Sequence, residues 1–390
     1  MSGNSSKYKY ILAMAAAAGL AFPQGAFATN GILQIGNGMV AHGLGGAGIA
    51  NAGEAAAGMD NPALITRTGN AASAGISIFN PNRSADFGGG YVASDSSYFY
   101  IPQAAYTSVI DARLSWGIMA YAMGGMNTDY PDTLIGEPSG VNLAGLIVAP
   151  TLAYKVTPGT AVGASLLLGY ESLKMRNVLG ITGDDSATSY GLKLGITTAV
   201  ADGVSLGATL QPKMQMGEIG YFCTALGGFG FSGDCQLTLP NIFGVGGKFA
   251  VGRDITIVAD ILQAQWSGVD VFDFFGWQDQ TIYKLGIEWR ASEALALRAG
   301  LNYGKSPIPE KVGVVTMNTW FPAVTETHVT LGASYKLSGM TTLTGYYLHA
   351  FNNTETDPAG VGSPLPNGLN ASRVKMDQNA LGVGINMMLR

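Results

Sequence analysis

The chain has 390 residues, and only 12% of them are charged, against about 25% in a typical globular protein. It contains 56 glycines, its mean hydropathy is +0.22, and its formal net charge at pH 7 is −5. A soluble protein so poor in charge would disperse badly, and the mildly acidic balance argues against a nucleic-acid-binding surface. The composition therefore favours a membrane protein.

The first residues have the pattern of a secretory signal peptide. Two lysines precede an apolar stretch that ends near Phe22, and Ala26-Phe27-Ala28 fits the small-x-small cleavage pattern. The alternative is a membrane-spanning helix, but an apolar core of roughly 13 residues falls short of the ~20 that such a helix needs. We therefore expect residues 1–28 to be a signal peptide.

Beyond this leader, apolar and polar residues alternate with a period of two. One example is the apolar row Tyr283, Leu285, Ile287 and Trp289, which is interleaved with Lys284, Gly286, Glu288 and Arg290. The same alternation recurs in 204–213, 295–303 and 329–337. Lipid would not tolerate the charges of the polar rows, so we expect the apolar rows to face a bilayer and the polar rows a lumen.

The joins between these segments alternate in length. Short turns are expected at 111–112, 157–159, 201–203, 252–253, 291–293 and 338–339, and long joins at 125–142, 171–187, 218–235, 266–279, 305–325 and 351–376. A soluble sandwich also alternates, but segments of about 10 residues match a tilted membrane strand. We predict an all-β fold: a transmembrane antiparallel β-barrel of about 14 strands over residues 71–390.

Residues 29–70 are rich in glycine, alanine and asparagine and show no clean strand pattern. Because this segment is apolar and precedes the first strand, we expect it to form a hatch (plug) inside the lumen. The alternative is a disordered leader. The two cysteines, Cys223 and Cys235, lie in a glycine-rich join. In an oxidising compartment they favour a loop disulfide, and a metal pair is the weaker option because no histidine is near.

Three motifs in order resemble the FadL/TodX family of outer-membrane transport proteins. They are Asn61-Pro62-Ala63 in the hatch segment, Leu237-Thr238-Leu239-Pro240-Asn241 before a strand, and Ala299 to Tyr303 followed by Ser306-Pro307-Ile308-Pro309. The resemblance covers the whole mature chain. It implies a fourteen-stranded barrel with an N-terminal hatch, an apolar ligand pocket, and a lateral opening beside a kinked third strand.

By position in the chain, Gly124 and Gly125 fall in that third strand, where they would break the pairing. The alternative is an ordinary strand end before a loop. The run Phe272, Phe274, Phe275 and Trp277 lies in an expected surface loop. An exposed aromatic cluster there could be where ligand enters, and an aromatic girdle at the lipid interface is the alternative.

The sequence departs from the family in three places. The hatch has Asn51 and Glu54 where an acidic pair is usual, the segment 321–324 is apolar, and the chain ends in Arg390. A fatty acid would need a cation for its carboxylate, and lumen-row candidates are Lys193, Lys213, Lys248, Lys284, Arg298 and Lys336. Each could instead pair with a lumen acid such as Asp260 or Glu288.

We therefore predict a passive outer-membrane transporter for hydrophobic small molecules, either long-chain fatty acids or aromatic hydrocarbons. No phosphate-binding loop is present to supply energy. We expect no cofactor, no metal and no enzymatic activity, since His42, His328 and His349 are far apart in sequence. Expected partners are the hydrophobic ligand, outer-membrane lipid, lipopolysaccharide and the barrel-assembly machinery, and a monomer is expected. A general diffusion porin and a structural or adhesive barrel are the alternatives.

Overall fold

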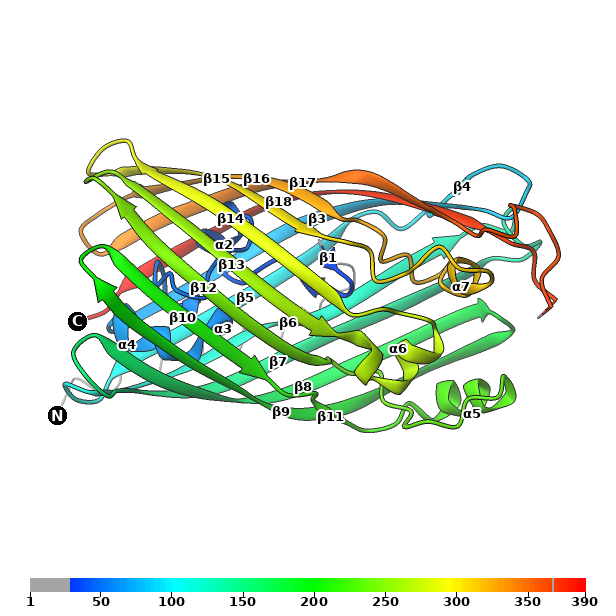
Figure 1. The fold of residues 1–390 in the computed structure, drawn as a ribbon, viewed down its shortest axis with the longest axis horizontal. Coiled ribbons are helices and arrows are strands. Elements are labelled where there is room, and N and C mark those ends of the chain that lie inside the picture. Colours follow the sequence, from blue (N-terminus) through cyan, green and yellow to red (C-terminus); the bar gives the residue numbers. More distant parts are fainter. Residues whose placement is uncertain (1–28, 367) are drawn as a thin grey trace.

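The computed structural model describes residues 29–366 and 368–390, so the expected signal peptide lies outside the described residues. Its main feature is a closed antiparallel barrel of 14 strands (Figure 1). The strands are β3 (Ala71–Asp86), β5 (Phe99–Val109), β6 (Leu114–Tyr130), β7 (Ser139–Lys155), β8 (Thr160–Val178), β9 (Ile181–Ala201), β10 (Val204–Gln211), β12 (Asn241–Val251), β13 (Ile255–Gln265), β14 (Gln280–Arg290), β15 (Leu295–Gly304), β16 (Thr327–Lys336), β17 (Thr341–Thr356) and β18 (Arg373–Met388). Strand β18 pairs with β3 and closes the ring. The predicted fold class is confirmed.

The period-two rows lie on the two faces of this barrel as predicted. Exposed apolar side chains on the outside include Leu206, Tyr283, Leu285, Ile287, Trp289, Leu297, Leu301, Tyr303, Leu331, Tyr335, Leu381 and Val383. The intervening charged side chains of Asp260, Lys284 and Arg298 are buried inside. This is the arrangement of a barrel whose outer surface meets lipid rather than water.

Several joins are shorter than predicted: 125–142 shrinks to 131–138 and 351–376 to 357–372, and the largest difference is at 171–187. Residues 171–187 were expected to be a loop, but β8 continues to Val178 and β9 begins at Ile181, so this prediction is wrong. The two strands pair almost to their tips, and Lys174 forms a 3.5 Å ion pair with Asp184 opposite it. Continued pairing satisfies backbone groups that a loop would leave to water, so polar composition alone was misleading.

The other long joins carry short elements at one end of the barrel. These are β4 (Val92–Ala93), β11 (Gln215–Met216), α5 (Gly220–Gly228), η2 (Trp266–Gly268), α6 (Asp270–Phe274) and α7 (Val314–Met317). Figure 1 shows α5, α6 and α7 together at this end, and the short turns at the other. Among the described residues, none of the helices has the length and apolar character needed to cross a membrane.

The N-terminal segment, residues 29–68, runs through the inside of the barrel (Figure 1). It consists of β1 (Thr29–Asn30), β2 (Leu33–Gln34), α2 (Met39–Gly43), α3 (Ala57–Asp60), η1 (Pro62–Leu64) and α4 (Ile65–Thr68). Hydrogen bonds hold it to side chains from opposite parts of the wall, including Gln103 of β5, Lys193 of β9, Asp260 of β13 and Thr330 of β16.

Inward-facing glycines make room for the N-terminal segment. A Cβ atom at Gly195 would lie 2.0 Å from Oδ1 of Asn61, and one at Gly300 would lie 2.0 Å from the amide nitrogen of Gly45. Real Cβ contacts are never this short, so a side chain at either position would push the segment away from the wall. Much of the unusual glycine content is thus a consequence of packing one piece of chain tightly inside another.

Candidate functional site

A central cavity of about 90 Å³ lies between the N-terminal segment and the wall. The apolar residues that line it include Leu33, Met123, Ile147, Leu239 and Leu262. The polar and charged residues that line it include Asn37, Asp60, Lys193, Gln211, Asp260 and Lys284. The lining therefore combines apolar surface with groups that can hold a polar group.

The charged side chains of this cavity are engaged with the backbone of the N-terminal segment. Lys193 Nζ donates to the carbonyl oxygen of Met59 at 2.7 Å, and Lys284 Nζ donates to that of Gly46 at 3.2 Å. Asp260 accepts hydrogen bonds from the amides of Gly48 and Ile49, at 2.7 and 3.1 Å. These groups anchor the segment. Among the predicted cations, Arg298 pairs with a lumen acid, Glu288, at 2.7 Å.

The Asn-Pro-Ala motif fixes a sharp turn against β9. The side chain of Asn61 accepts a hydrogen bond from the Ala63 amide at 3.0 Å, which caps the short helix η1 at its start. Its Nδ2 atom donates to the carbonyl oxygens of Ile49 and Ile196, at 2.8 and 3.0 Å. One fully buried amide thus joins the turn to a distant part of the segment and to the wall.

A hairpin formed by β1 and β2, here the N-terminal hairpin, separates the central cavity from a second one. Leu33 and Gln34 line the central cavity, whereas Gly31 lines the other, which we name the seam cavity. The seam cavity measures about 20 Å³ and touches β3, β6 and β18. Movement of this one hairpin would connect the two spaces.

The barrel wall beside the seam cavity is incompletely paired. Strand β6 pairs with β7 up to Tyr130, yet its ladder with β5 spans only residues 115–120 in the described chain. The hairpin covers part of the unpaired stretch, because the Gly125 amide donates to the Ile32 carbonyl oxygen at 3.4 Å. We name this stretch between β5 and residues 121–130 of β6 the seam.

Gly124 and Gly125 lie in the seam. The register between β6 and β7 shifts between Ala122 and Gly124, which leaves Met123 as an extra, bulged residue. The strand continues to Tyr130, so the alternative of a strand end at the glycine pair is wrong. A bulge releases backbone groups from the ladder, and here the carbonyl oxygen of Ala122 accepts a 3.3 Å hydrogen bond from Gln34 of the hairpin.

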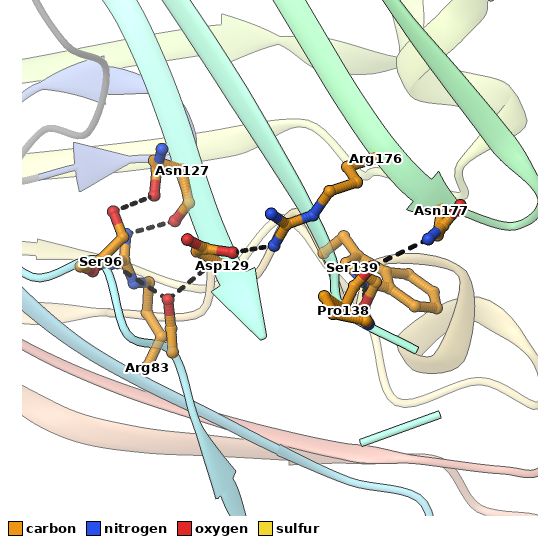
Figure 2. Close-up of polar contacts among 10 residues, drawn as sticks. Arg83, Ser96, Asn127, Asp129, Pro138, Ser139, Arg176 and Asn177 are labelled. Carbon is orange, nitrogen blue, oxygen red and sulfur yellow. Dashed lines mark hydrogen bonds and ion pairs between the residues drawn. The ribbon is translucent and has the colours of Figure 1, made fainter. Parts of the chain in front are cut away.

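A polar clasp of Arg83, Ser94, Ser96, Asn127, Asp129 and Arg176 closes the seam at the long-loop end (Figure 2). The guanidinium of Arg83, which is only 3% exposed, donates to the backbone carbonyls of Asn127 and Ser96. Figure 2 also shows Asp129 facing Arg176, with which it forms an ion pair. The clasp ties the β3–β5 side of the seam to the β6–β8 side.

The predicted aromatic cluster is not exposed, which corrects the expectation for the 266–279 join. Phe272, Phe275 and Trp277 are 2%, 6% and 2% exposed, and Phe274 is half-buried. The reason is that η2 and α6 fold back, so that Phe272 and Trp277 pack on Trp266 at ring distances of 5.1 and 5.2 Å. The cluster forms the core of a cap, by which we mean the joins that contain α5, α6 and α7, and it packs inward rather than forming a lipid-facing girdle.

The cap is also held by a covalent bond. Cys223 and Cys235 are joined by a disulfide that closes the join containing α5. Phe222, beside it, is buried in the same apolar cluster as Phe272. The described residues contain no cluster of three His, Cys, Asp or Glu side chains able to hold a metal ion.

Comparison with known proteins identifies the chain. The model of the family described as outer membrane protein transport protein (OMPP1/FadL/TodX) matches residues 18–211 and 188–388. The chain belongs to this family. It is accordingly an outer-membrane β-barrel of a Gram-negative bacterium, and its family consists of transport channels. A search of the curated proteins found no match.

Solved structures show the same fold at low sequence identity. The toluene transporter TodX of Pseudomonas putida is similar with a TM-score of 0.71 and 16% identity, over 91% of this chain and 99% of that one. A FadL homologue of Pseudomonas aeruginosa gives 0.70 and 13%, over 93% and 100%. The toluene transporter TbuX of Ralstonia pickettii gives 0.64 and 16%, over 91% and 99%.

Some residues of the site were missed by the sequence reasoning. Arg83 gave a signal, because it is a charged residue in the middle of a long strand, but nothing in β3 alone shows that its partners lie in β6 and in residues 94–97. The bulged residue Met123 gave no signal of its own. The glycine pair next to it did, and it lies one residue away from the register shift.

Proposed function

We propose that this family member carries small hydrophobic molecules passively across the outer membrane. The proposal is supported by structural relatives that are known as a toluene transporter and a monoaromatic hydrocarbon channel. The observation that carries it is the N-terminal hairpin between two small cavities, one of them beside an incompletely paired wall. Residues 29–70 serve as the hatch, and the cap is the place where ligand is taken up from outside.

Size favours a gated route rather than an open pore. A cavity of about 150 Å³ is enough to hold benzene in a protein core, whereas the central and seam cavities measure about 90 and 20 Å³. Neither accommodates an aromatic ring without movement. Displacement of the hairpin joins the two spaces, and it also removes Ile32 from the seam, so one movement provides both a pocket and an exit.

The exit runs sideways through the seam into lipid. Residues 121–130 of β6 have few ladder bonds to break on the β5 side, and apolar side chains from both strands, including Phe99, Ile101 and Ala122, pack there. A hydrophobic molecule leaving this way stays in apolar surroundings throughout. Burial of apolar area makes binding in the pocket favourable. Removal of ligand on the inside keeps its concentration there low, and this difference in concentration drives the flow.

The same geometry supports a protein without enzymatic activity. In the described residues, the hydrogen-bonding partners of His42 and His349 are the carbonyl of Gly38 and the side chain of Asn379, and neither is a nucleophile. Lipopolysaccharide around the barrel and the barrel-assembly machinery remain proposed partners, and a monomer remains the proposed state.

Two measurements test the transport proposal. In planar bilayers, the purified protein should show little steady ion current, whereas a general diffusion porin should conduct. Deletion of Met123 removes the bulged residue and restores continuous pairing of β6 with β7. We expect this variant to fold but to lose toluene uptake in cells lacking the native protein, and Met340 at an exposed turn offers a matched deletion control. Steady conductance, or full uptake by the Met123 deletion, would refute the proposal.

A further inference from the structure

Glu171 is a buried carboxyl group that the structure leaves without a partner. It lies in β8 between Gly169 and Leu173 on the inward face, and it is only 2% exposed. Its Oε1 atom is buried without a hydrogen bond, and in the described part of the chain Glu171 has no ion pair. A buried carboxylate normally has a donor or a cation beside it, because loss of water is otherwise uncompensated.

The lysine on the inward face of the neighbouring strand is too far away to pair with it. Lys193 lies opposite Ser165, six residues down β8 from Glu171, which places it about 20 Å away at the usual rise per strand residue. Lys174 and Arg176 face outward on the same strand and pair with Asp184 and Asp129. This carboxyl group is therefore not part of the ion-pair network that anchors the hatch.

Small residues of the neighbouring strands flank Glu171, and the Met123 side chain fills the space over one of them. The residues opposite Glu171 are Gly145 in β7 and Ala187 in β9, which have the smallest side chains available. The inward residues flanking Gly145 are Leu143 and Ile147, both buried in the main apolar cluster. Glu171 is thus a single acceptor group in an apolar, small-residue part of the lumen wall.

Met123, the bulged residue of the seam, packs beside this position. Its Cβ and Cε atoms each lie 2.9 Å from where a Cβ of Gly145 would be, and its sulfur lies 3.8 Å from Oγ of Ser189. Met123 also lines the central cavity. A molecule held in this cavity that displaces the flexible Met123 side chain would therefore come next to Glu171 before it moves to the seam.

We propose that Glu171 binds a hydrogen-bond donor on the transported molecule, so that the substrate class is a hydrophobic compound carrying an amine or a hydroxyl group. This inference rests on the proposed transport function and narrows its substrate. A bare hydrocarbon leaves the carboxyl group unmatched, and a fatty-acid carboxylate offers it no hydrogen-bond donor. An ammonium or hydroxyl group of the ligand would supply the hydrogen-bond donor that Glu171 lacks among the described residues.

A series of four probes that share one ring tests the proposal. Toluene, benzyl alcohol, benzylamine and benzoate are titrated into the full mature protein in lipid nanodiscs, and binding is measured by calorimetry. We expect benzylamine to bind at least tenfold more tightly than toluene, since a hydrogen bond that involves a charged group contributes roughly tenfold to hundredfold in affinity, and benzyl alcohol to bind about threefold to tenfold more tightly. Benzoate should bind least.

Variants separate the two kinds of donor. Glu171→Gln keeps an acceptor oxygen but no charge, so benzylamine should weaken at least tenfold while benzyl alcohol changes little. Glu171→Leu should weaken both and leave toluene unchanged. Glu137→Gln, in an exposed turn, is the matched control and should change nothing. Thermal unfolding gives an independent readout, because Glu171→Leu should raise the melting temperature by removing an unmatched buried carboxyl group.

The outcomes also separate this inference from the transport proposal. If toluene binds as well as benzyl alcohol and benzylamine do, or if Glu171→Leu leaves donor binding intact, the role of Glu171 is refuted while hydrophobic transport stands. If none of the four compounds binds the native protein, both proposals fail. Because the comparison of probes on the native protein decides the first question, the test does not depend on any variant folding.

Discussion

Replacement of Asn61 by alanine should loosen the hatch without unfolding the barrel. The native side chain makes three hydrogen bonds, to Ile49, Ala63 and Ile196, and it is fully buried. Leaving a buried partner unsatisfied costs about 1–3 kcal/mol per group, so the loss of three bonds should cost about 4 kcal/mol after relaxation. Local opening of the segment should then become about a thousandfold more frequent.

Hydrogen exchange followed by mass spectrometry measures this opening directly. We expect peptides covering 45–66 to exchange about a thousandfold faster in Asn61→Ala, while peptides from β13 to β16 keep their protection. Asn61→Asp should be no better, because it retains the bond from Ala63 but brings a carboxylate to the carbonyls of Ile49 and Ile196. Asn353→Ala, which removes hydrogen bonds to Val324 and Glu355 away from the hatch, is the matched control. Unchanged exchange of 45–66 in Asn61→Ala would refute the anchoring role of the motif.

Three further predictions follow from the contacts of the hatch and the clasp. Gly300→Val should displace Gly45 and raise both ion conductance and protease cleavage near it, while Gly339→Val, whose Cβ meets open space, should not. Burial raises the pKa of Glu54 to about 7 from an ordinary 4.5, so its contribution to stability is fully present below pH 4.5 and is lost as the pH rises through 7. The loss should be about 3 kcal/mol in urea unfolding in micelles, and Glu54→Gln should flatten the profile. Arg83→Met should speed hydrogen exchange of residues 94–97, and exposed Arg113→Met should not. Equal exchange in the two arginine variants would contradict the clasp.

The strand pattern was predictable because the two faces of each strand meet different surroundings, lipid on one side and the lumen on the other. Lipid selects the apolar row and the lumen selects the polar row, so Tyr283 and Lys284 report their faces without knowledge of any neighbour. The Asn-Pro-Ala motif and the glycine pair were found by resemblance. Their roles depend on contacts such as that of Asn61 with Ile196. These contacts are set by the registers of several strands, so no single segment of sequence predicts them.

The same dependence explains the errors. Phe272 and Trp277 were expected to be exposed because their join is polar and follows a strand, yet the surface that buries them comes from Trp266 and from residues near 320. Glu171 fell in a stretch that was expected to be a loop. Only the pairing of β8 with β9 turns it into a wall residue that faces the lumen. A polar residue in a surface loop cannot be distinguished by sequence from a polar residue on the lumen face of a strand.

The length of the β8–β9 hairpin places part of this protein well outside the bilayer. Strand β8 has 19 residues, which corresponds to about 63 Å of extended chain and to about 48 Å of height at the usual strand tilt. The apolar band of an outer-membrane barrel is only about 25 Å tall. This side of the barrel therefore extends well beyond the apolar band, and the proposed uptake of compounds at the cap would take place outside the hydrocarbon layer.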